Sequence, residues 1–133
     1  MNTLNLVKIL GELGGRFPKS KLPDIMYYLS NMLRDGRVIL IKENGINYAV
    51  AFVSLGSDYN EYYKKGTWDY RKHDVTGRVL YVELIVCRQW NKHLRKLFQN
   101  ELLSWFPQIE EAHWHRWASW GDRHITWRRK IHV

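Results

Sequence analysis

The stretch VLYVELIVC, residues 79–87, decides the fold of this chain because it is apolar throughout except for Glu83. A run of this length and composition predicts a central strand whose two faces are both buried. With strict alternation, one face would carry Leu80, Val82, Leu84 and Val86, and the other Val79, Tyr81, Glu83 and Ile85. The carboxylate of Glu83 therefore needs an explanation, since burying an unpaired charge is costly.

Two explanations of Glu83 follow from its position. Such a carboxylate could serve as a general base that takes a proton from an amine, directly or through a water molecule. It could instead be structural, either in an ion pair with a cation such as Arg37 or at a point where the strand reaches solvent. The sequence leaves both roles open.

The segments around this strand alternate between helical and β patterns. Apolar residues at helical spacing predict helices over residues 3–13 and 23–34. Two β-branched, apolar segments joined by Asn44 and Gly45 predict a hairpin. Beyond it we expect a long loop, a helix and two closing strands, at residues 56–78, 91–106, 112–119 and 124–133. The helix would turn one apolar face toward the sheet, formed by Leu94, Leu97, Phe98, Leu102 and Trp105.

Length and composition fit a single α+β domain, with a central mixed or antiparallel sheet flanked by helices. A hydrophobic content of 45% in 133 residues is ample for one core. No run approaches the roughly 18 apolar residues of a membrane span, and the N-terminus lacks a secretory-signal pattern. We therefore expect a cytoplasmic setting, or a virion interior if a phage encodes the chain. Cys87 is the only cysteine, which excludes an internal disulfide, and we predict no metal site.

The order of these elements, together with LYVELIVCRQWNKHLRKLF at residues 80–98, resembles the GNAT acyltransferase superfamily. In that superfamily an apolar strand with an internal acidic residue leads into a helix whose N-terminus holds the pyrophosphate of coenzyme A. VILIKENGINYAVAFVSL, at residues 38–55, is more closely similar to the RTX-toxin-activating lysine acyltransferases. The resemblance implies a GNAT-like fold and an N-acyltransferase that uses acetyl-CoA or another acyl-CoA and an amine acceptor.

The resemblance also assigns roles to individual residues. Glu83 would be the catalytic base, and the backbone around Val86 would hold the pantetheine arm. The phosphates would lie at the start of the following helix, at Asn91, Lys92, His93, Arg95 and Lys96. The family's phosphate loop contains glycines because they let backbone N–H groups approach the phosphate. Residues 89–94, QWNKHL, contain none, so charged side chains would bind the phosphates instead. The catalytic His and Asp of the lysine acyltransferases fall on Lys19 and Trp90, so neither carries over.

An excess of basic residues independently favours an anionic partner. The formal net charge is +8, and aromatic residues interleaved with cations suit base stacking with phosphate contacts, or a protein partner. The candidate contacts are Lys64, Lys65, Trp68, Arg71, Arg128 and Arg129. The alternative function is thus a non-catalytic GNAT-like module that binds nucleic acid or protein, such as a virion component or host-targeting factor of a phage or mobile element. Homo-oligomer formation is left open.

Overall fold

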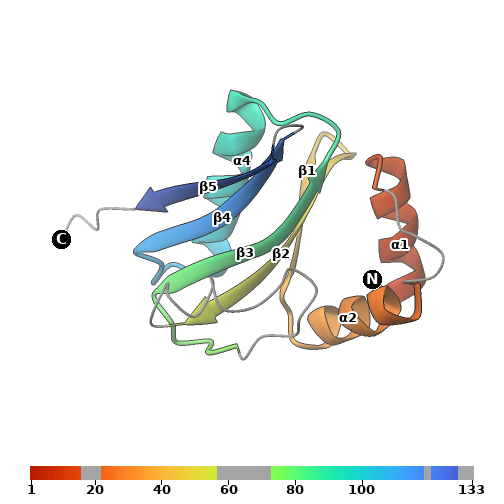
Figure 1. Ribbon diagram of the computed structural model, residues 1–133, viewed down its shortest axis with the longest axis horizontal. Helices are drawn as coiled ribbons and strands as arrows, with labels where there is room; N and C mark the ends of the chain where they lie inside the picture. Colours follow the sequence, from red (N-terminus) through yellow and green to blue (C-terminus); the bar gives the residue numbers. More distant parts are fainter. Residues whose placement is uncertain (16–21, 57–72, 119–120, 129–133) are drawn as a thin grey trace.

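The computed structural model describes residues 1–15, 22–56, 73–118 and 121–128, with side chains up to His113. Its elements are α1 Thr3–Glu12, α2 Leu22–Arg34, β1 Val38–Glu43, β2 Ile46–Gly56, β3 Val79–Cys87, α4 Lys92–Trp105, β4 Glu111–Ala118 and β5 Gly121–Arg128. The strands form one sheet in the order β1-β2-β3-β4-β5 (Figure 1). The predicted α+β class is confirmed, and the apolar stretch at 79–87 is the middle strand, paired with β2 as expected.

The sheet is mixed because its strands are connected in two different ways. Hairpins join β1 to β2 and β4 to β5, so these pairs are antiparallel. The β1–β2 turn has positive φ at both Asn44 (54°) and Gly45 (77°), which is the two-residue geometry that Asn-Gly favours. By contrast, the chain passes from β3 to β4 through α4, and these two strands are parallel. Such a crossover needs a helix-length connection.

Helices cover both faces of the sheet, with α4 on one side and α1 and α2 on the other (Figure 1). Alternate residues of β2 point to opposite faces of the sheet. Ala51 packs in the cluster with α4, and Phe52 packs in the cluster with α1 and α2. The prediction that the 91–106 helix crosses the sheet is confirmed through buried Leu94, Phe98 and Leu102. Trp105 was wrongly placed on that face. It is exposed at the last turn, where its Nε1 donates to Glu101.

A β-bulge in β3 overturns the expected alternation of its side chains. Phe52 of β2 pairs with Leu84, but the next residue, Val53, pairs with Val82, so Glu83 is an extra residue in the ladder. The insertion reverses the facing of everything beyond it. Leu80 and Val82 pack toward α4, together with Ile85 and Cys87. Leu84 and Val86 pack toward α1 and α2. The expectation that Leu80, Val82, Leu84 and Val86 share one face is therefore wrong.

Candidate functional site

Glu83 lies at the bulge, buried with an exposure of 5%. Its Oε1 accepts a hydrogen bond of 2.8 Å from the hydroxyl of Ser54, which is fully buried on the neighbouring strand. Ser54 shares the parity of Val50 and Phe52, whose side chains pack toward α1 and α2. The carboxylate is therefore directed to the face that carries these two helices, and one of its oxygens is held by a donor.

Arg37 is the largest fully buried side chain in the described part of the chain, and it secures the bulge. Its Nε donates to the carbonyl of Val53 at 2.8 Å, and its own carbonyl accepts from the Val53 N–H at 3.0 Å. Val53 is the residue of β2 at which the register shifts. The guanidinium also donates through Nη2 to the hydroxyl of Ser54. A buried cation is thus joined through a serine hydroxyl to the buried carboxylate of Glu83.

This Arg37–Ser54–Glu83 chain bears on both explanations of Glu83. The structural explanation named Arg37, and the structure brings Arg37 to Glu83 through Ser54. The catalytic role stays a prediction, because a carboxylate oriented by a hydrogen bond is also what a general base requires. Ser54 was not predicted, although a hydroxyl inside the apolar run of residues 49–55 is a signal of a buried polar contact.

His73 lies next to the hydrogen-bonded Arg37–Ser54–Glu83 group, just ahead of the turn that leads into β3. Its Nδ1 accepts a hydrogen bond of 3.1 Å from the backbone N–H of Leu55. The pKa of His73 lies below its usual value, chiefly because burial disfavours the charged ring and secondly because Arg37 is close; Asp35 and Asp74 act in the opposite direction. No sequence pattern indicated this residue.

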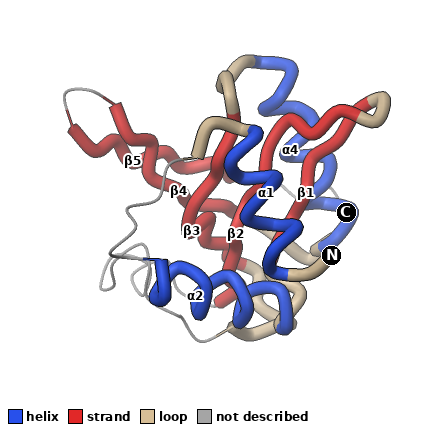
Figure 2. Tube along the Cα trace, turned by 90° about the vertical axis from the view of Figure 1, so that its right-hand side faces the viewer, coloured by secondary structure: helices blue, strands red, loops and turns tan. Residues whose placement is uncertain are grey.

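Strands β3 and β4 part from one another immediately before Glu83. Their parallel pairing begins at Val79–Glu111 and ends at Val82–Trp114, although β3 continues to Cys87 and β4 to Ala118. In Figure 2 the β4–β5 hairpin projects away from the other three strands. Side chains of β3 change at the same place, from buried up to Glu83 to half-buried beyond it. The backbone edge of residues 84–87 that faces away from β2 therefore has no ladder partner in β4.

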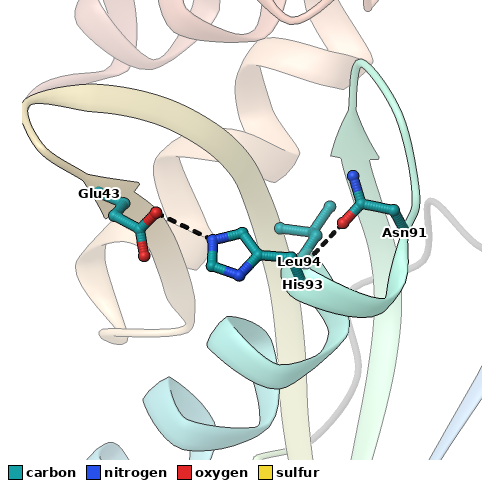
Figure 3. A network of polar contacts seen from close by, with 4 residues as sticks. All are labelled: Glu43, Asn91, His93 and Leu94. Atoms are coloured by element: carbon teal, nitrogen blue, oxygen red, sulfur yellow. Dashed lines mark hydrogen bonds and ion pairs between the residues drawn. The ribbon is translucent and has the colours of Figure 1, made fainter.

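The start of α4 follows directly after this open edge. Asn91 is the N-cap, and its side-chain oxygen accepts from the N–H of Leu94 at 2.8 Å (Figure 3). The amides of Lys92 and His93 have no intrahelical acceptor, as at any helix start. The imidazole of His93 contacts the carboxylate of Glu43, with 2.9 Å between Nε2 and Oε1. This contact ties the start of α4 to the end of β1.

The predicted acyl-CoA residues fall at these two neighbouring places. Lys92, Arg95 and Lys96 are exposed on the first turns of α4. Val86 turns its side chain into the cluster with α1 and α2, so only its backbone belongs to the open edge.

Burial raises the pKa of the half-buried Cys87 thiol, which disfavours the reactive thiolate.

The residues predicted to contact nucleic acid or a partner have side chains outside the described part of the structure. Lys64, Lys65, Trp68, Arg71 and Arg129 lie outside the described residues, and the side chain of Arg128 does as well. Within the described residues, no group of three His, Cys, Asp or Glu is arranged to hold a metal ion. None of the helices in the same part of the chain combines the length and apolar content that a membrane span needs.

Comparisons with known proteins do not assign the chain to a family. No family model, no curated protein and no solved structure matches it.

Proposed function

We propose that this protein is an acyl-CoA-dependent N-acyltransferase of the GNAT type that acts on an amine acceptor. The observation that carries the proposal is the parting of the parallel strands β3 and β4 beside Glu83. Among the described residues, no strand pairs with the backbone edge of residues 84–87 that faces away from β2, and we call this the open edge of β3. An extended chain with amide groups can bind such an edge as an added strand would. The pantetheine arm of acyl-CoA is a chain of this kind.

The start of α4 supplies the charge that the phosphates of acyl-CoA need. Lys92, Arg95 and Lys96 are exposed there, on the first turns of the helix that follows β3 in the chain. The helix N-terminus adds its partial positive charge. Because Asn91 already occupies the Leu94 amide, binding would depend more on lysine and arginine side chains than on backbone N–H groups. The residues present thus fit the phosphates as a cationic surface.

Glu83 would perform the proton transfer. Acyl-CoA would supply a thioester, whose carbonyl carbon forms a bond to the amine nitrogen while the carbon–sulfur bond breaks. The sulfur leaves with the bonding electrons, and the amine gives up a proton. Glu83 would accept that proton, directly or through water, while Ser54 holds its Oε1 in place. A thermal-shift titration with acetyl-CoA tests binding: at about ten times Kd, a ligand adds roughly 1.4 kcal/mol to the free energy of unfolding.

Two pairs of variants make this test specific. Lys96→Gln should weaken the acetyl-CoA shift, whereas Lys8→Gln removes an exposed charge from α1 and should not. Glu83→Gln should lower turnover on an amine acceptor by about 10²–10⁴-fold, the usual contribution of a general base. Glu12→Gln, an exposed carboxylate at the end of α1, should leave turnover unchanged. Absence of any shift and any turnover with the wild-type protein would contradict the proposal.

A second candidate function is a non-catalytic module that binds a polyanion, nucleic acid above all. It is favoured by the exposed cations at the start of α4 and by the capping of that helix by its own Asn91. On this proposal the Arg37–Ser54–Glu83 chain only stabilises the bulge. The cytoplasmic or virion-interior setting and the oligomeric state stay predictions under either function.

A further inference from the structure

The ring of His73 accepts a hydrogen bond from a backbone amide of the sheet, that of Leu55 in β2. The N–H of Leu55 donates to its Nδ1 at 3.1 Å, and the N–H of Asp74 donates to the carbonyl of Leu55 at 3.0 Å. Residues 73 and 74 therefore hold both backbone groups of Leu55. A ring nitrogen can accept only while it carries no proton, so the first of these bonds requires neutral His73.

The segment that contains His73 is packed closely against the end of β2. A side chain at Gly77 would bring its Cβ within 2.6 Å of the backbone nitrogen of Gly56, so only glycine allows this approach. Asp74 closes the turn of residues 74–77, since its carbonyl accepts from the N–H of Gly77 and its carboxylate accepts from Thr76. The segment 73–77 thus lies directly against the last two residues of β2, Leu55 and Gly56.

The residue that His73 holds is the direct neighbour of Ser54. Ser54 donates to Glu83, so the position of the β2 backbone at Leu55 and Ser54 affects the orientation of that carboxylate. Three charged groups act on the His73 ring: Arg37 from just ahead of β1, Asp35 from the turn after α2, and Asp74 from its own segment. Burial and Arg37 outweigh the two carboxylates and keep the pKa of His73 below its ordinary value.

We propose that neutral His73 is a pH-sensitive positioning residue that holds the end of β2 beside Ser54, and that its protonation releases this hold. Protonation turns Nδ1 from an acceptor into a donor that faces the Leu55 N–H and adds a positive charge near Arg37. The consequence for catalysis by Glu83 rests on the proposed function, but the hold itself does not.

The direction of the pH effect follows from the lowered pKa. The unfolded chain takes up the proton at about the ordinary value, 6.5, and the folded protein takes it up only at lower pH. The stability contributed by neutral His73 is therefore complete above that value. It is lost as the pH falls through the window between the unfolded and folded pKa values.

The test is amide hydrogen exchange of Leu55, followed by NMR from about pH 7.5 to about pH 5 and corrected for the intrinsic rate. In the wild-type protein we expect the protection of the Leu55 amide to fall by roughly 2–10-fold in acid, which corresponds to the loss of one hydrogen bond. His73→Asn places an amide oxygen near the position of Nδ1 that accepts at every pH, so its protection should stay constant. His73→Phe keeps a ring without an acceptor and should show the low protection throughout.

The exposed His93 provides the matched control for the exchange measurement alone: in His93→Asn the Leu55 amide should lose protection in acid as it does in the wild-type protein. Constant protection in the wild-type protein, or the same loss in His73→Asn, would overturn the proposal. Because this measurement needs no substrate, it decides the role of His73 even if acyl-CoA neither binds nor reacts. If turnover is found, its pH profile can be compared between the wild-type protein and His73→Asn. A decline in acid that only the wild-type protein shows supports an effect of His73 protonation on Glu83, and the same decline in both proteins contradicts it.

Discussion

Removal of the buried cation beneath the bulge should be among the most damaging single changes to this fold. Arg37→Met keeps an apolar stem of similar length but takes away the guanidinium that donates to the Val53 carbonyl and to Ser54. It also leaves the buried Glu83 carboxylate without the cation reached through Ser54. We expect the free energy of unfolding to fall by about 3–5 kcal/mol, the typical cost of removing one partner from a buried charge pair. That is a large part of the 5–15 kcal/mol that stabilises a typical domain.

Glu83→Gln should be milder, because the amide oxygen still accepts the proton of Ser54 while the negative charge is lost. We expect a cost of about 1–3 kcal/mol. In the double variant neither charge is left alone, so its cost should be below the sum of the single costs by about 1 kcal/mol or more. Urea unfolding followed by the fluorescence of the 7 tryptophans measures all four proteins. Additivity within about 0.5 kcal/mol would show that Arg37 and Glu83 are not coupled, and would contradict a stabilising link through Ser54.

Three further outcomes are expected. Gly77→Ala should lower the free energy of unfolding by about 1–3 kcal/mol, because its Cβ would meet the Gly56 backbone; an unchanged urea midpoint would contradict the close packing of this turn. Asn91→Ala should cost about 0.5–2 kcal/mol by removing the cap of α4, and a neutral result would contradict the capping bond. If the protein binds single-stranded nucleic acid through α4, Lys92→Gln should reduce the log–log salt slope by about 0.7. Lys8→Gln should leave the slope unchanged, and equal slopes in all three proteins would exclude α4 from the interface.

Regular patterns in the sequence were enough to predict the order of the elements. The apolar run of β3, the Asn44–Gly45 turn and the stripe of α4 each depend on local chemistry. All three predictions are confirmed, except that Trp105 does not belong to the stripe. The α+β class and the central place of β3 followed from them. The GNAT-like character of the fold stays a proposal, since the order and pairing of the strands define a fold class and do not by themselves identify a family.

The bulge at Glu83 could not be predicted in the same way. Its position depends on how β2 and β3 align and on Arg37, which binds both backbone groups of Val53. These contacts join residues far apart in the chain, and alternation within one strand carries no information about them. The candidate site was therefore predicted in part, since Glu83 and its link to Arg37 were anticipated. Ser54 was not predicted, although its hydroxyl inside an apolar run was a signal, and His73 emerges only from the packing of the sheet.

The most direct test of the proposed function is an NMR titration of the isotope-labelled protein with acetyl-CoA, read at each backbone amide. We expect shifts at residues 84–87, on the open edge of β3, and at residues 92–96, on the first turns of α4. Amides on the outer surface of α1, such as that of the exposed Leu4, should not move. No shifts at millimolar acetyl-CoA, or shifts confined to residues 92–96, would contradict an acyl-CoA site between β3 and β4. The second of these results would leave α4 as an anion-binding surface alone.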